Sequence, residues 1–273
     1  MRTVVLYARS PQWRAVVERA DELMASPDFR VLKSEARTCA GFIDVGAGAA
    51  FIKRVDVGSW SRGIVARLLG SRAKRSLAGA AMLEAHGLAH PEPLAAMDSY
   101  HAGAIRASYL VSRALVNADS LSRFMLGPGE IKGRNVHRRK QISDAVALQV
   151  RRLHESGIYT RDLQETNIMV EDSEAGGFKV YFIDLEDFRR ATKVSWDRRM
   201  LNLVHLDRSI GRFLCRAARL AFLYSYLGHR PDRAAARKIV AEVKAARESI
   251  DRRKRRSVPA TERVVAPFAG GTR

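Results

Sequence analysis

Short runs of alternating apolar and polar positions occupy the first third of the chain, which is the pattern of half-buried β-strands. These runs predict strands over 29–33, 41–45 and 49–55. Gly46 and Gly48 fall between the last two runs, where a hairpin turn requires positive φ. Ahead of the strands, apolar residues at helical spacing predict a short helix over 12–24.

Helical patterns dominate the rest of the chain. A basic segment rich in Ala and Leu predicts a helix over 61–86, with Gly87 where a C-cap belongs. An apolar stripe predicts a long helix over 137–156. The remaining apolar runs predict a strand within 105–115 and a β-hairpin made of 168–170 and 179–183. Beyond residue 196 the pattern is mostly helical.

The order of these elements predicts an α+β fold with two lobes. We expect a smaller β-rich N-lobe over 1–112 and a larger helical C-lobe over 113–256. Residues 257–273 contain two prolines and a Gly-Gly pair, and we expect them to form a loose tail.

Charge changes the picture more than composition does. Hydrophobic residues make up 47% of the 273 residues, which is enough for a folded core. The 48 Lys and Arg exceed the 29 Asp and Glu, which leaves a net charge of +19 and favours anionic partners. The cations gather within 62–75, 132–140 and 230–256. These runs lack interleaved aromatic residues and no nucleic-acid motif is present, so nucleic acid is an unlikely partner.

Compartment is indicated by what the sequence lacks. Cys39 and Cys215 form neither a disulfide framework nor a zinc pattern, which fits a reducing compartment. No run reaches the roughly 18 apolar residues of a membrane span, and the apolar run at the N-terminus is too short for a signal peptide. We therefore expect a cytoplasmic protein whose contact with a membrane is peripheral.

The candidate chemistry lies around the predicted hairpin. Asp162 and Asn167 occupy the loop between the long helix and the first hairpin strand, and Asp184 follows the second strand. Phosphoryl transfer requires such a set, because one carboxylate orients the attacking hydroxyl while an amide oxygen and a second carboxylate hold Mg²⁺. Lys53 lies on a predicted strand just after the Gly46 and Gly48 turn, where a lysine can reach nucleotide phosphates. Singly, each residue is more often a solvated or capping residue; together, their order favours a kinase fold.

Several segments resemble the lipopolysaccharide core kinase family, the Kdo and heptose kinases of the WaaP/InaA type, within the protein-kinase-like superfamily. The segment 50–54 resembles the family's nucleotide-lysine strand, and 108–113 is similar to its strand beside adenine. The segment 87–94 resembles the family's path from helix into sheet. The strongest similarities are the catalytic loop at 157–170 and the metal-binding strand end at 182–186.

The resemblance implies a protein-kinase-like bilobal fold and an enzyme that uses ATP and Mg²⁺. By that resemblance Asp162 is the catalytic base, Asn167 and Asp184 are the Mg²⁺ ligands, and Lys53 is the phosphate-binding lysine. Gly46 and Gly48 would form the glycine turn at the nucleotide. The implied reaction phosphorylates a sugar hydroxyl of a lipopolysaccharide core or similar anionic glycolipid, at the inner face of the cytoplasmic membrane.

Three positions depart from the expected pattern. Thr160 stands where a loop-packing His is usual, and Gln164 stands where a Lys or His would neutralise developing phosphoryl charge. Glu84, the only acid in 61–86, follows Lys53 too late to be its expected partner, so the sequence leaves that partner open. A pseudokinase that binds anionic surfaces therefore remains an alternative. So does a small-molecule kinase, whereas the short segment after Asp184 argues against a protein kinase.

Overall fold

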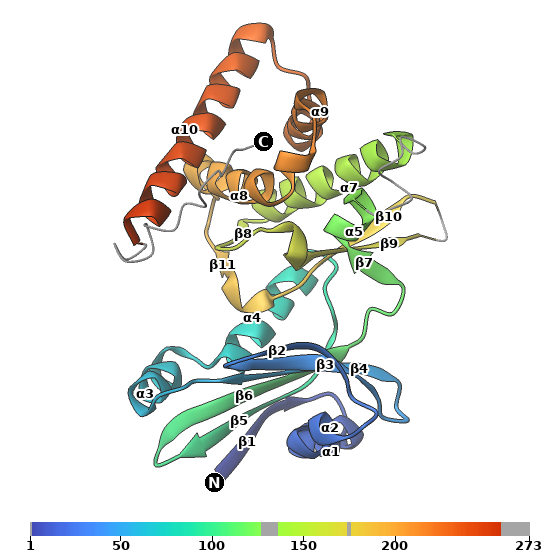
Figure 1. Cartoon of the computed structure of the whole chain (residues 1–273), viewed down its shortest axis with the longest axis vertical. Coiled ribbons are helices and arrows are strands. Elements are labelled where there is room, and N and C mark those ends of the chain that lie inside the picture. Colours follow the sequence, from blue (N-terminus) through green and yellow to red (C-terminus); the bar gives the residue numbers. More distant parts are fainter. Residues whose placement is uncertain (1, 127–135, 174–175, 258–273) are drawn as a thin grey trace, which may run out of the picture.

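The computed structural model describes residues 2–126, 136–173 and 176–257. The tail expected over 257–273 falls outside the described residues from residue 258 on, as does the part of the basic connector that holds Lys132 and Arg134. A sheet with flanking helices forms one part of the molecule and a mainly helical assembly forms the other (Figure 1). The predicted mixed α+β architecture, with the sheet first and the helices after it, is confirmed.

The N-terminal part is built on a six-stranded antiparallel sheet of order β1-β5-β6-β4-β3-β2. Four strands match predicted runs: β2 (Arg30–Glu35), β3 (Thr38–Asp44), β4 (Ala49–Asp56) and β6 (Ala104–Arg113). Two strands were not predicted, β1 (Arg2–Ala8) and β5 (Pro93–His101). Residues 94–99 of β5 are all buried, so this strand lacks the alternation that a one-sided strand shows.

One face of the sheet is covered by α1 (Pro11–Glu18) and α2 (Ala20–Ala25) (Figure 1). The helix predicted over 12–24 is therefore two helices, because Arg19 between them leaves helical dihedral angles. Ser10 caps α1 by accepting a hydrogen bond from the Trp13 backbone N–H. Trp13 and Val17 pack with Ile52 and other sheet residues to form the core of this part.

The prediction of a single helix over 61–86 is wrong. The segment forms α3 (Trp60–Leu69) and α4 (Arg72–Glu84), because Gly70 adopts φ of 93° and Ser71 starts a new helix by accepting from the Lys74 N–H at 3.1 Å. Helix α4 lies between the two parts of the molecule (Figure 1). Its Ala80 and Leu83 belong to the core of the helical part, so this helix joins that core to the sheet.

The second part begins with β7 (Ala118–Ser120) and α5 (Leu121–Leu126) and continues with the predicted long helix α7 (Val136–Glu155). The predicted hairpin is confirmed as β9 (Ile168–Asp172) and β10 (Phe178–Phe182), with β7 as a third strand. A second small sheet pairs β8 (Ile158–Thr160) with β11 (Phe188–Arg190). The described part of the chain ends in the helices α8 (Trp196–Ser209), α9 (Arg216–Leu227) and α10 (Arg233–Ser257), with the 3₁₀ turn η3 (Gly211–Phe213) after α8.

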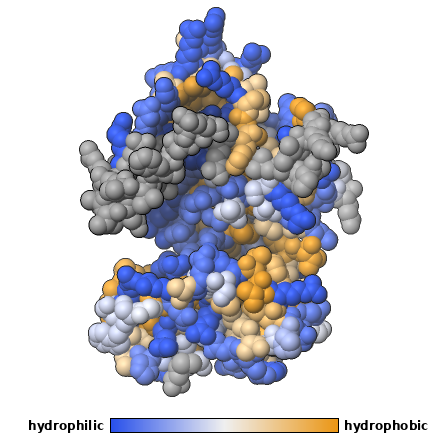
Figure 2. All heavy atoms as spheres, in the orientation of Figure 1, coloured by the Kyte–Doolittle hydropathy of each residue, from blue (hydrophilic) through white to orange (hydrophobic). Residues whose placement is uncertain are grey.

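Surface composition differs along this part. Figure 2 shows hydrophilic residues along the outer face of α10 and hydrophobic residues over α9 beside it. Among the described helices, none combines the length and the apolar composition that crossing a bilayer would require.

Candidate active site

Two small ladders bring the candidate residues into one region. The β8–β11 pair and the β9–β10 pair enclose the loop that carries Asp162 and the 3₁₀ turn η1 (Glu165–Asn167). The Ile183 N–H donates to the Asn167 carbonyl at 3.0 Å, which sets Asn167 beside the residue that precedes Asp184. These hydrogen bonds bring together three side chains that are separated in sequence.

Asp162 is held from several directions. Its backbone N–H donates to Thr160 Oγ1 at 3.3 Å, and its carbonyl accepts from Asn167 Nδ2 at 3.0 Å. Its carboxylate accepts a hydrogen bond from Gln164 Nε2 and lies 3.9 Å from Nδ1 of His205 on α8. The side chain keeps 45% of its surface exposed, so a substrate hydroxyl can approach it. The sequence did not predict a role for His205, because this residue reaches the loop from a helix that is distant in sequence.

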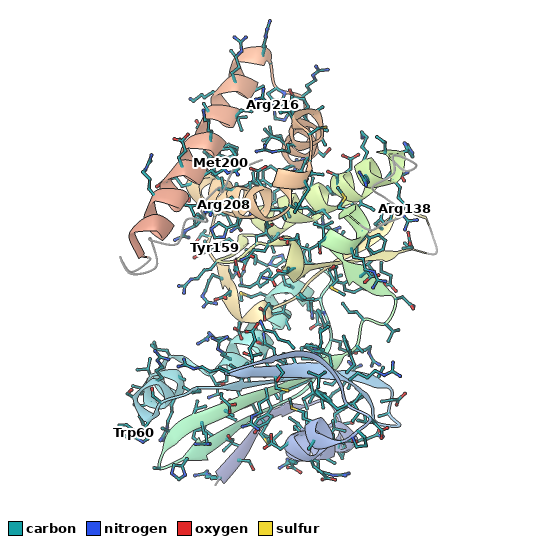
Figure 3. The ribbon with its side chains drawn as sticks, viewed as in Figure 1. Trp60, Arg138, Tyr159, Met200, Arg208 and Arg216 are labelled. Atoms are coloured by element: carbon teal, nitrogen blue, oxygen red, sulfur yellow. The ribbon has the colours of Figure 1, made fainter. Side chains whose placement is uncertain are left out.

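Thr160 is fixed by its backbone rather than by a packed imidazole. Asn202 on α8 accepts from the Thr160 N–H at 3.3 Å and donates to its carbonyl at 2.6 Å. The same Asn202 oxygen lies 3.1 Å from Nε2 of buried His154, whose Nδ1 lies 2.8 Å from the Tyr226 hydroxyl. Because that oxygen is an acceptor, Nε2 of His154 donates and Nδ1 accepts from Tyr226. Figure 3 labels Tyr159, the neighbour of Thr160 on β8, close to α8.

Burial sets the charge of this network. Desolvation lowers the pKa of His154 to about 4, and the positive charge of Arg199 adds to the effect, while the hydrogen bond to Asn202 opposes it. His154 is therefore neutral at neutral pH. The Thr160 side chain cannot anchor the loop as a packed histidine would. A neutral, buried chain of hydrogen bonds through Asn202, His154 and Tyr226 anchors it instead.

Lys53 and Asp184 meet across the two parts of the molecule. Lys53 Nζ on β4 forms an ion pair with Oδ1 of Asp184. Asp184 has φ of 60° and ψ of 52°, a left-handed conformation that costs a non-glycine residue about 1–2 kcal/mol. It immediately precedes the 3₁₀ turn η2 (Leu185–Asp187). The structure thus brings the expected phosphate-binding lysine and one expected metal ligand into direct contact.

Glu186 is a second residue near the site to which the sequence assigns no role. Its carboxylate is buried in η2 and forms an ion pair with Arg72 at the start of α4. Burial raises the pKa of Glu186, and the nearby charges of Lys53 and Arg72 act in the opposite direction. The acids near Lys53 therefore come from the turn after β10 and not from the helical segment 61–86.

Gly46 and Gly48 form the turn between β3 and β4, with φ of 73° and 117°. The Gly46 N–H donates to Oδ1 of Asp44 at 3.0 Å, which closes the turn. A Cβ atom at either glycine would meet nothing within 4 Å, so the turn needs glycine for its backbone angles and not for a close contact within the protein. A nucleotide-binding role for these two residues stays a prediction.

The side-chain oxygens of Asn167 and Asp184 are suitable ligands for a Mg²⁺ ion that also binds a nucleotide. Among the described residues there is no group of three or more His, Cys, Asp and Glu side chains that would bind a metal alone. Mg²⁺, however, is commonly held by one or two carboxylates together with substrate phosphates. The amide nitrogen of Asn167 donates to the Asp162 carbonyl, which leaves the amide oxygen available as a metal ligand.

The sheet lysine pairs with the strand-end aspartate, and the loop aspartate and asparagine are joined to the same turn by hydrogen bonds, an arrangement typical of a kinase-like protein. The comparisons agree with this class. The model of the Lipopolysaccharide kinase (Kdo/WaaP) family matches residues 57–226, and because this is more than half of the chain, the chain belongs to that family. Membership assigns it to the lipopolysaccharide kinases.

Among the solved structures that the chain resembles, one shares the fold over nearly its whole length. The chain is similar to WaaP in complex with acyl carrier protein, with a TM-score of 0.65 and 20% identity. The match covers 91% of this chain and 99% of that one. No curated protein matches the chain.

Proposed function

We propose that this protein transfers the γ-phosphate of ATP to a sugar hydroxyl of a lipopolysaccharide core or similar anionic glycolipid. The observation that carries the proposal is the convergence of Asp162, Asn167 and Asp184 with Lys53 in a member of a lipopolysaccharide kinase family. No residue in this set is replaced by one that lacks the required donor or acceptor, which favours an active enzyme over a pseudokinase.

Each side chain has a role that its position supports. Asp162 accepts the proton of the acceptor hydroxyl, whose oxygen forms a bond to the γ-phosphorus as the bond to the β-phosphate oxygen breaks and ADP leaves. Asn167 and Asp184 would hold Mg²⁺, which supplies neutralisation of phosphate charge. Lys53 would turn from Asp184 to the nucleotide phosphates when the carboxylate engages the metal.

The test is phosphate transfer from labelled ATP to a panel of glycolipid cores, free sugars and proteins. We expect label on the glycolipid cores, and a loss of about 10²–10⁴-fold in rate for Asp162→Ala, because general base catalysis contributes that much. Mg²⁺-ATP should still raise the melting temperature of that variant. Asp119→Ala is the matched control, because the Asp119 side chain has the same 45% exposure but lies on β7 in an ion pair with Arg123.

The outcomes separate the alternatives. An unchanged rate for Asp162→Ala would refute the assigned base. Label on free sugars alone would favour a small-molecule kinase, and label on proteins a protein kinase. A wild-type chain that Mg²⁺-ATP does not stabilise would favour a pseudokinase that binds anionic surfaces.

We propose acyl carrier protein as a partner, because the similar solved structure contains it and this chain has a cavity suited to an acyl chain. The cavity has a volume of about 580 Å³ and lies among α5, α7, α8, α9 and α10. Its walls are mainly apolar, with Leu203, Leu220 and Val240 among them. Cationic residues also line it, including Arg216 at the start of α9, which is labelled in Figure 3. The apolar walls suit an acyl chain, and the cationic residues suit an anionic group on the molecule that carries it.

Calorimetric titration with acylated and unacylated carrier protein tests this partner. We expect acylation to tighten binding, and Val240→Asp to weaken the acylated complex by about tenfold or more, because a charge would then meet the buried chain. Val116→Asp is the control, since Val116 is exposed and does not line the cavity. Equal affinity for both carrier forms would contradict the proposal.

A further inference from the structure

Glu186 is a buried carboxylate that the proposed reaction does not use. It lies two residues after Asp184, and only 6% of its surface is exposed. Its carboxylate accepts a hydrogen bond from Nη1 of Arg72, the first residue of α4. A buried charge is retained where a partner compensates it, and the pair joins a helix to the turn that carries the metal ligand.

Helix α4 also touches that turn through its backbone. A Cβ atom at Gly79 would lie 2.2 Å from the Leu185 carbonyl oxygen, so the helix and η2 are in contact with no side chain between them. Ser76, on the same helix face, lines a small pocket together with Lys53, Arg72 and Glu186. Because α4 contacts Leu185 and Glu186 directly, its position determines where the residues that follow Asp184 lie.

The turn is held on its other side as well. Nη1 of Arg189 donates to the Glu186 carbonyl at 2.8 Å and to the Phe188 carbonyl at 2.7 Å. Phe188 then enters the ladder with Thr160 of β8. The residues that follow Asp184 are therefore held by α4 on one side and by β11 on the other, and this supports the left-handed backbone of Asp184.

We propose that Arg72 and Glu186 are positioning residues, which hold Asp184 at the metal site and keep an acid beside Lys53 when Asp184 turns to the metal. The helix supplies the cation of this link and the turn supplies the acid. This arrangement explains why 61–86 contains no acid at a suitable position for Lys53. The inference rests on the proposed function, because it assigns Asp184 to Mg²⁺ and Lys53 to phosphate.

The experiment measures ATP affinity with and without Mg²⁺ for the full chain and its variants. We expect Arg72→Ala and Glu186→Gln to reduce the Mg²⁺-dependent gain in affinity by about 10–100-fold, which is typical when a partner of a metal ligand is removed. Metal-free ATP affinity should change much less. Arg72→Lys keeps the charge and should recover part of the gain. Lys74→Ala removes an exposed cation from the same helix and serves as the control.

The results distinguish failure of the positioning role from failure of the proposed function. An Mg²⁺ gain in Arg72→Ala and Glu186→Gln equal to that of the wild-type chain would overturn the positioning role and leave the proposed function intact. A wild-type chain that binds no nucleotide would overturn both. If Arg72→Ala fails to fold, Arg72→Lys and the nearly isosteric Glu186→Gln still test the positioning role, because both keep the shape of the site.

Discussion

Thr160 stands where a histidine is usual, and its backbone is nevertheless held in place. Its N–H and carbonyl are both bound by Asn202, and Asn202 is fixed in turn by His154. His154 and Asn202 are each 1% exposed, so no water replaces these bonds. The support expected from a loop histidine comes instead from Asn202 of α8, which His154 of α7 holds in place.

The buried His154 makes stability depend on pH. Its pKa is about 4 in the folded protein and about 6.5 when unfolded, so the unfolded chain binds more protons between these values. As far as His154 is concerned, the free energy of unfolding is therefore at its full value above about pH 6.5 and falls as the pH drops toward 4. We expect a loss of about 3 kcal/mol from this group, measured by denaturant unfolding at several pH values.

The control is His154→Gln, which keeps a donor for Asn202 but does not titrate. Its unfolding free energy should fall less steeply over this range than that of the wild-type chain. The exposed His101, replaced by Gln, should leave the slope unchanged. Parallel curves for the wild-type chain and His154→Gln would refute a neutral buried imidazole.

At the scale of elements, α4 decides how the site is built. It starts at a new N-cap, Ser71, rather than continuing α3, and the break turns it so that Gly79 meets the backbone of η2. The signals for the break, Gly70 followed by Ser71, are local and visible in the sequence. The contact that makes a glycine necessary at residue 79 is not, because Leu185 is far away along the chain.

The strands show the same division. The runs that became β3 and β4 each contain buried residues separated by more exposed ones, and the turn between these strands carries the expected glycines, whereas β2 is exposed along its whole length. β5 is covered on both sides and carries no alternation, so its apolar run does not distinguish a strand from another buried segment. β8 and β11 have three residues each, too few for a periodic pattern.

At the scale of the whole molecule, the net charge of +19 suits a protein that works against an anionic surface. We propose the inner face of the cytoplasmic membrane as its location. The segment 230–256 holds eleven Lys and Arg against four Asp and Glu, and much of it forms α10. Each Lys or Arg near an anionic bilayer contributes about 1 kcal/mol to binding.

Vesicle sedimentation tests this location. We expect binding to phosphatidylcholine vesicles that contain phosphatidylglycerol, little binding to phosphatidylcholine alone, and release as salt is raised, because salt screens surface charges. Replacing exposed Arg237 and Lys238 of α10 by Gln should weaken binding more than replacing exposed Arg30 and Lys33 of β2. Equal losses would point to net charge alone, and binding that ignores lipid charge would refute the proposal.

The sequence by itself determined that a β-rich part precedes a helical part, and it supplied the residue types that phosphoryl transfer needs, since Asp162, Asn167, Asp184 and Lys53 lie in short segments with recognisable local patterns. Only the tertiary structure decided which of them touch and what supports them. The pairing of Lys53 with Asp184, the approach of His205, and the link from Arg72 to Glu186 each join residues from separate elements. Local periodicity reports which face of an element is buried, but not which distant side chain is buried against it.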